Sequence, residues 1–199
     1  MADDKRGREK QARDADRRQR ERDVEAQLSR GDEPEPPVDY DALGTLEAEL
    51  DSLDFPVTGS EVVAAVGEHE VDSADGTHTV AELVPETDDE RFDDPAAVSV
   101  RVQRPTVATA TKRILEACAE YQGAELRGSQ REAYEKTLRA LAAIDADDED
   151  EGIRVVTDWI VERLHETGSL PGSREVRREA ASFCRSNGFE IRNDEWLGI

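Results

Sequence analysis

Four arginines near the carboxyl end are the residues of this sequence best suited to a chemical task. They are Arg174, Arg177, Arg178 and Arg185, within the run SREVRREAASFCRSNG at 173–188. On a helix they fall at about 0°, 300°, 40° and 20°, so they share one face. A guanidinium group stays charged, and its planar fork binds a phosphate or a guanine through two hydrogen bonds. The pattern therefore predicts contact with DNA or RNA.

The opposite face of the same helix is apolar and suits a protein core. Val176, Ala180 and Phe183 fall at about 200°, 240° and 180°. Two acids lie closer to the arginines, since Glu175 and Glu179 fall at about 100° and 140°. The alternative is therefore that the arginines form ion pairs within the protein or with a protein partner.

The rest of the sequence offers little for catalysis or for a metal. The histidines are His69, His78 and His165; the first two flank an expected hairpin turn and could face each other, but no further ligands follow at a zinc-site spacing. The acidic run DADDEDE at 145–151 lacks the glycine and the final glutamate of an EF-hand loop. The sequence has no glycine-rich phosphate loop or nucleophile elbow. We therefore expect a protein that is not an enzyme, with no cofactor and no metal.

Acidic residues dominate the composition. The chain has 199 residues, with 26 basic and 48 acidic side chains, a net charge of −22 and a pI near 4.5. Four of the basic residues are lysines, so 26 − 4 = 22 are arginines. At molar salt the Debye length falls to about 3 Å, which screens the repulsion among carboxylates. The composition is typical of a halophile protein, although an acidic disordered regulator would explain part of the chain.

The sequence also indicates in which cellular compartment the protein is located. Its apolar runs fall short of the roughly 20 residues of a membrane span, and the opening MADDKRGREKQARDADRRQRERD lacks the apolar region of a signal peptide. Cys118 and Cys184 sit among apolar helical neighbours, which suits reduced, buried thiols. We expect a cytoplasmic protein with no membrane contact.

Composition divides the chain into four segments, of which the first, 1–39, is a charged leader with its linker. Residues 1–30 contain ten basic and eight acidic residues, a charge of 10 − 8 = +2, which leaves −22 − 2 = −24 for the remainder. Opposite charges recur at helical spacing, as in Glu9 with Arg13. We expect a solvated helix or a disordered segment. The alternative is an arm that lies on nucleic acid or a ribosomal surface, against which the interleaved acids argue.

The second segment, 40–125, has the pattern of a small α+β domain. The run YDALGTLEAELDSL predicts a helix that ends before Pro56. The run TGSEVVAAVG predicts a second helix, capped by Thr58 or Ser60 and ended by Gly67.

Strands and a third helix follow in the same segment. Alternation in EHEVDSADGTHTV predicts a hairpin with strands near 68–73 and 77–82. The run AVSVRVQ, at 97–103, predicts a third strand because its valines alternate. The run RPTVATATKRILEACAEYQG predicts a helix opened by Pro105 and closed by Gly123. The residues expected to supply the core are Phe55, Val62, Val63, Val66, Val80, Leu83, Val84, Phe92, Val100, Ile114 and Leu115.

Two stretches of the sequence resemble a domain family. The run LDFPVTGSEVVAAVGEHEV, followed by TVAELVPETDDERFDDPAAVSVRVQRPTVATATKRILEA, resembles an uncharacterised domain family of haloarchaeal proteins and is similar to a small bacterial domain that opens on Asp-Phe-Pro. The resemblance covers roughly residues 50–117, and the leader is similar to one that such proteins often carry. Because the family has no assigned function, the resemblance implies no catalytic or binding residues.

The last two segments are helical. Segment 126–151 predicts a helix in SQREAYEKTLRALAAI, capped by Ser129, and then the acidic loop. Segment 152–199 predicts two helices joined by the short turn SLPG, followed by a strand or tail. Their expected inward residues are Tyr134, Leu138, Leu141, Ile144, Ile153, Val156, Trp159, Ile160 and Leu164.

The segments together predict an α+β protein. A small helix and hairpin domain is followed by a helical pair and a C-terminal module like a helix-turn-helix. We expect a binding or regulatory protein of a halophile that contacts nucleic acid through the arginine-faced helix. The alternative is an interaction or assembly module that binds a protein partner or a second copy through Trp196 or the paired helices. The first function requires a positive patch, and the second predicts an apolar patch or a dimer.

Overall fold

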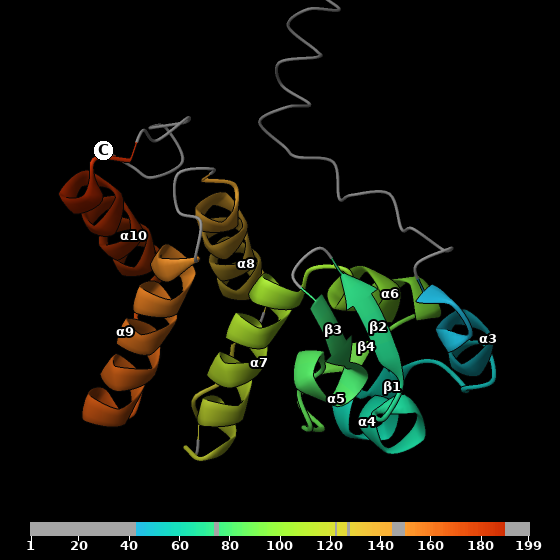
Figure 1. Ribbon diagram of the computed structural model, residues 1–199. Coiled ribbons are helices and arrows are strands. Elements are labelled where there is room, and N and C mark those ends of the chain that lie inside the picture. Colours follow the sequence, from blue (N-terminus) through green and yellow to red (C-terminus); the bar gives the residue numbers. More distant parts are fainter. Residues whose placement is uncertain (1–42, 74–75, 122, 127, 145–149, 190–199) are drawn as a thin grey trace, which may run out of the picture. The chain divides into compact units, whose positions relative to one another are not determined.

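The computed structural model describes residues 43–73, 76–121, 123–126, 128–144 and 150–189. These residues form eight helices and two short antiparallel strand pairs, so the expected α+β class is confirmed (Figure 1). The expected leader at 1–39, most of the acidic loop and the tail with Trp196 lie outside the described residues. No described helix is long and apolar enough to cross a membrane.

The amino-terminal part of the described chain is built from short elements around one apolar core. They are α3 (Leu46–Leu50), β1 (Val57–Thr58), α4 (Gly59–Val66), β2 (Glu70–Ser73), β3 (Gly76–Thr79), α5 (Val80–Leu83), β4 (Arg91–Phe92) and α6 (Pro95–Val102). Strand β1 pairs with β4, and β2 pairs with β3.

Helix α4 begins where the sequence predicts. The Thr58 hydroxyl accepts a hydrogen bond from the backbone N–H of Glu61 at 3.2 Å, and the Glu61 carboxylate accepts one from the N–H of Thr58 at 2.7 Å. The helix ends at Gly67, as expected. Its first residue must be glycine, because a Cβ at Gly59 would clash with the backbone oxygen of Pro85.

The hairpin is confirmed, but its second strand is shorter than predicted. In the β2–β3 ladder His78 pairs with Val71, and strand β3 ends at Thr79. The chain then turns into α5 because the Glu82 carboxylate accepts a hydrogen bond from the N–H of Thr79 at 2.8 Å. This local cap replaces the predicted extension of the strand to 82.

The predicted third strand at 97–103 is wrong, because these residues belong to helix α6. The Asp94 carboxylate caps the helix by accepting from the N–H of Ala97 at 2.9 Å, and Pro95 occupies its first turn. Val98 and Val102, four residues apart, are both fully buried, whereas Val100 is half-buried. A helix separates the three valines that a strand would have placed on one face.

Four longer helices make a second apolar core, and they lie side by side in Figure 1. They are α7 (Pro105–Ala119), α8 (Gly128–Ala142), α9 (Glu151–Thr167) and α10 (Ser173–Asn187). Helix α7 opens at Pro105 as predicted but ends at Ala119, before Gly123. Helix α8 begins at Gly128, so Ser129 lies inside its first turn and the prediction that Ser129 caps the helix is wrong.

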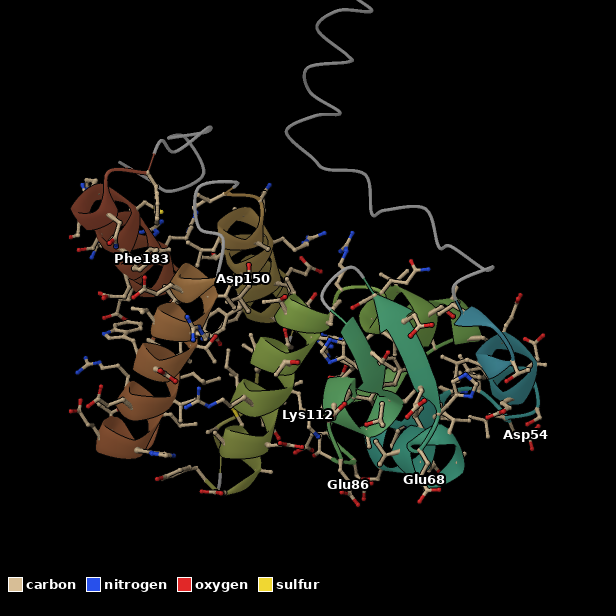
Figure 2. The ribbon with its side chains drawn as sticks, viewed as in Figure 1. Asp54, Glu68, Glu86, Lys112, Asp150 and Phe183 are labelled. Carbon is tan, nitrogen blue, oxygen red and sulfur yellow. The ribbon has the colours of Figure 1, made fainter. Side chains whose placement is uncertain are left out.

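Helix α7 belongs to both cores. Ala108 packs in the amino-terminal core and Ile114 in the core of the four helices. On the same helix the ammonium of Lys112 donates to the backbone oxygen of Val84 at 3.2 Å, at the end of α5 (Figure 2). Helices α7 to α10 share one core. The segment boundaries at 125 and 151 stay predictions.

Most predicted core positions are confirmed. Phe55, Val63, Ile144 and Trp159 are only partly buried and pack against the two cores. Fully or nearly fully buried are Val62, Val66, Val80, Leu83, Val84, Phe92, Ile114, Leu115, Tyr134, Leu138, Leu141, Ile153, Val156, Ile160 and Leu164.

Candidate nucleic-acid interface

Helix α10 carries the four predicted arginines, and its ends are fixed locally. The carboxylate of Glu175 accepts a hydrogen bond from the backbone N–H of Gly172 at 2.8 Å. The N-cap is therefore Gly172, and the prediction that Ser173 caps the helix is wrong. Gly188 ends the helix with φ of +71°, a conformation that glycine adopts without strain, as predicted.

The apolar face of α10 packs against α8 and α9. Val176 and Ala180 are fully buried and Phe183, labelled in Figure 2, is 8% exposed, which confirms the predicted inner face. The turn before the helix is held by α8, because Tyr134 Oη and Gln130 Nε2 both donate to the backbone oxygen of Pro171, at 2.6 and 2.9 Å. The packing fixes which side of α10 faces solvent.

The structure places three of the four predicted arginines on the solvent side. Arg174, Arg178 and Arg185 are exposed, whereas Arg177 is half-buried and its Nε donates to the backbone oxygen of Ser173 at 3.3 Å. We call Arg174, Arg178 and Arg185 the arginine stripe. Its members follow one another at helical spacings of four and seven residues, so the stripe runs along the helix.

Among the described residues, the arginine stripe forms no ion pair with the two acids of its own helix. The Glu175 carboxylate accepts a hydrogen bond from the N–H of Gly172, and the Glu179 side chain is half-buried. Within the described residues the stripe makes no ion pair of 4.0 Å or less. Basic residues elsewhere do pair with acids, namely Arg101, Lys112, Arg113, Arg131 and Arg163.

Other basic groups without an ion pair in the described chain are Arg91 and Arg139. The first is exposed on β4 and the second is half-buried on α8, so neither adjoins the stripe in sequence. On one helix of a chain with a net charge of −22, the stripe thus gathers three positive charges that have no ion pair among the described residues.

A second ionic group, which the sequence did not predict, lies between the two cores, and one of its four members is fully buried. We call Glu90, Arg101, Arg131 and Glu135 the charge cluster. Arg101 on α6 lies 3.1 Å from the carboxylates of both Glu90 and Glu135. Arg131 on α8 also contacts both acids, with its Nε 3.2 Å from Glu135. The sequence shows only the spacing of Arg131 and Glu135, four residues apart on one helix.

The charge cluster is strongly desolvated at one end. The Glu90 side chain is 0% exposed, and its Oε2 has no hydrogen-bond partner among the described residues. Burial alone would raise the pKa of Glu135, but the charges of Arg101 and Arg131 outweigh it and hold that pKa below the ordinary value. Burial likewise opposes the charge of Arg131, yet hydrogen bonding to Glu90 raises its pKa.

The histidines and cysteines are dispersed in the fold. His78 faces Val71 across the hairpin, whereas His69 lies outside the ladder with its Nδ1 3.5 Å from the Glu49 carboxylate. The two histidines therefore do not face each other across the hairpin. In the part of the chain that the structure describes, no group of three His, Cys, Asp or Glu side chains could hold a metal.

Both cysteines are buried free thiols, as their apolar neighbours predicted. Burial raises the pKa of Cys118 to about 11, and the charge of Asp89 acts in the same direction. A thiol with this pKa is protonated at neutral pH, which disfavours nucleophilic or metal-binding chemistry at Cys118.

Residues 42–113 match a family of unknown function (DUF5789). The match confirms the resemblance to a domain family without assigned function, and it covers the elements from α3 to α6 with the first half of α7. Neither the curated proteins nor the solved structures contain a match to the chain. The arginine stripe lies outside the matched residues, so the family does not bear on it.

Proposed function

We propose that this protein is a non-enzymatic binding or regulatory protein of a halophile's cytoplasm, and that α10 contacts nucleic acid through the arginine stripe. The observation that carries the proposal is the exposure of Arg174, Arg178 and Arg185 with no acidic partner among the described residues. The helix-turn-helix geometry of α9 and α10 stays part of this proposal.

The charge of the whole chain makes the stripe informative. A protein with 48 acidic residues repels polyanions at long range, so a phosphate contact must come from a local reversal of the field. At high salt the repulsion is screened over a few ångströms, while short guanidinium–phosphate hydrogen bonds persist. Arginine suits this contact better than lysine because its fork binds two phosphate oxygens.

A binding titration tests the proposal. Fluorescence anisotropy of labelled duplex DNA and RNA is measured over the range of KCl in which circular dichroism shows the protein folded. We expect binding whose logarithm falls linearly with the logarithm of salt, with a slope of about −0.9 for each phosphate contacted on B-DNA. The variant Arg174→Glu, Arg178→Glu removes two contacts, so binding weakens at every salt and the slope flattens by about 1.8.

A single exchange provides the matched control. Arg91→Glu changes the net charge as much as Arg178→Glu does, also at an exposed arginine without an ion pair in the described chain, but on β4. It should leave the affinity nearly unchanged. Equal losses in Arg91→Glu and Arg178→Glu would show that only net charge matters, and no binding by the folded wild type would refute the proposal.

The alternative is a protein-interaction module, for which α9 offers a small surface. Val155 is 37% exposed and Trp159, four residues later on the same face, is half-buried. A second copy or a protein partner would cover these side chains. Sedimentation of the wild type and of Val155→Asp tests this function: a dimer that dissociates in the variant would favour it.

A further inference from the structure

The exposed face of α10 carries the arginine stripe, whose guanidinium groups bind phosphate. Amide side chains read adenine through paired hydrogen bonds. Asn187, at the end of α10, donates through Nδ2 to the backbone oxygen of Phe183 at 3.0 Å, and Gln130 on α8 donates through Nε2 to that of Pro171 at 2.9 Å. Ser182 is exposed between Arg178 and Arg185.

The helix also lacks an exposed aromatic platform in its described residues. Its one aromatic, Phe183, is 8% exposed and packs against Phe189, with the ring centres 5.8 Å apart. Proteins that hold single strands stack the bases on exposed aromatic rings. The surface of α10 is therefore better suited to a duplex, whose bases are already stacked.

The amino-terminal turn of α10 opposes an end-on approach to the bases. In helix-turn-helix proteins the first residues of the recognition helix contact the base edges. Here the exposed carboxylate of Glu175 accepts a hydrogen bond from the N–H of Gly172, at the start of α10. A negative charge at this end would meet the phosphates that line the groove, so approach by the flank is favoured over approach by the tip.

The dimensions of the arginine stripe fit a duplex of B form. Arg174 and Arg185 are 11 residues apart, which is about 16 Å along a helix axis. A helix of about 10–12 Å diameter fits the major groove of B-DNA, roughly 12 Å wide, whereas the major groove of A-form RNA is too narrow. The stripe can thus follow the phosphates of a DNA groove along the flank of the helix.

We propose that the ligand of α10 is the phosphate backbone of double-stranded DNA, bound without regard to sequence, and that Glu175 keeps the tip of the helix away from the bases. This inference rests on the proposed function. It adds the class of nucleic acid, the mode of binding and a residue that sets that mode.

Affinities of the full chain for four probes of equal length test the ligand class: two DNA duplexes of unrelated sequence, single-stranded DNA and an RNA duplex. At one salt concentration the two DNA duplexes should bind within about threefold of each other, because phosphate contacts carry no sequence information. Single strands and RNA should bind at least about tenfold more weakly.

The outcomes separate the two proposals. If none of the probes binds, the proposed function fails and this inference fails with it. A preference of tenfold or more between the DNA duplexes, or tighter binding of RNA or of single strands, overturns this inference while nucleic-acid binding stands.

The role of Glu175 has its own test. Glu175→Gln removes a charge next to the DNA and should tighten binding by about fivefold, because the repulsion of two unit charges about 4 Å apart in water is worth about 1 kcal/mol. Glu162→Gln removes the same charge from an exposed position on α9 and serves as the control. Equal effects in both variants would overturn the role of Glu175.

Discussion

The guanidinium of Arg101 on α6 lies 3.1 Å from the carboxylate of Glu135 on α8. The first residue lies within the 42–113 match and the second lies outside it. The pair therefore joins the part of the chain that matches the family to the four-helix core that carries the arginine stripe.

The charge cluster should stabilise this junction. Arg131→Met would leave the fully buried carboxylate of Glu90 with one cation fewer, and removal of one partner from a buried ion pair costs about 3 kcal/mol. Arg163→Met breaks the exposed pair with Glu166 and should cost less than about 1 kcal/mol. Denaturant unfolding in molar KCl measures both. Equal losses would mean that the cluster contributes no more than a surface pair.

The same cluster predicts a dependence of stability on pH. The pKa of Glu135 is lowered in the folded protein, so the folded state holds its proton less tightly than the unfolded state does. The stabilisation is complete above the ordinary pKa of glutamate, near 4.3, and it is lost as the pH falls through the lower folded pKa.

Thermal unfolding at pH 6 and at pH 3 isolates this contribution when Glu135→Gln is compared with wild type. The variant should be less stable at pH 6, and the difference should shrink at pH 3. Glu166→Gln, at an exposed acid, controls for the change in net charge. A difference between Glu135→Gln and wild type that is the same at both pH values would argue against the assigned ion pairs.

The helical assignment of α6 is testable with two valines. Val102 is fully buried, so Val102→Ala should lower the free energy of unfolding by about 2 kcal/mol through lost apolar burial and the cavity that remains. Val100 is half-buried, so Val100→Ala should cost less than about 1 kcal/mol. If 97–103 formed a strand with its valines on one face, the two variants would lose similar amounts.

Interactions and backbone preferences of residues close in the sequence explain where the sequence predicted the fold correctly. The cap of α4 at Thr58, the start of α7 at Pro105 and the end of α10 at Gly188 each depend on residues within a few positions. The wrong prediction of a strand at 97–103 also came from a pattern of neighbouring residues. Alternating valines indicated a strand, but the Asp94 cap and the pair Val98 and Val102 favour a helix once the amino-terminal core is present to bury them.

Distant contacts decided the rest. The helical spacing determined that the four arginines oppose an apolar face, but packing of α10 against α8 and α9 decided that Arg174, Arg178 and Arg185 are exposed while Arg177 is half-buried. Glu90 and Arg131 are 41 residues apart, and each is unremarkable among the many acids and arginines of the chain. Only the docking of α8 against the loop before β4 brings them into contact. The sequence by itself determines the faces and ends of helices through interactions between nearby residues. Which side chains are buried and which form ion pairs depends on the elements that the folded chain brings together.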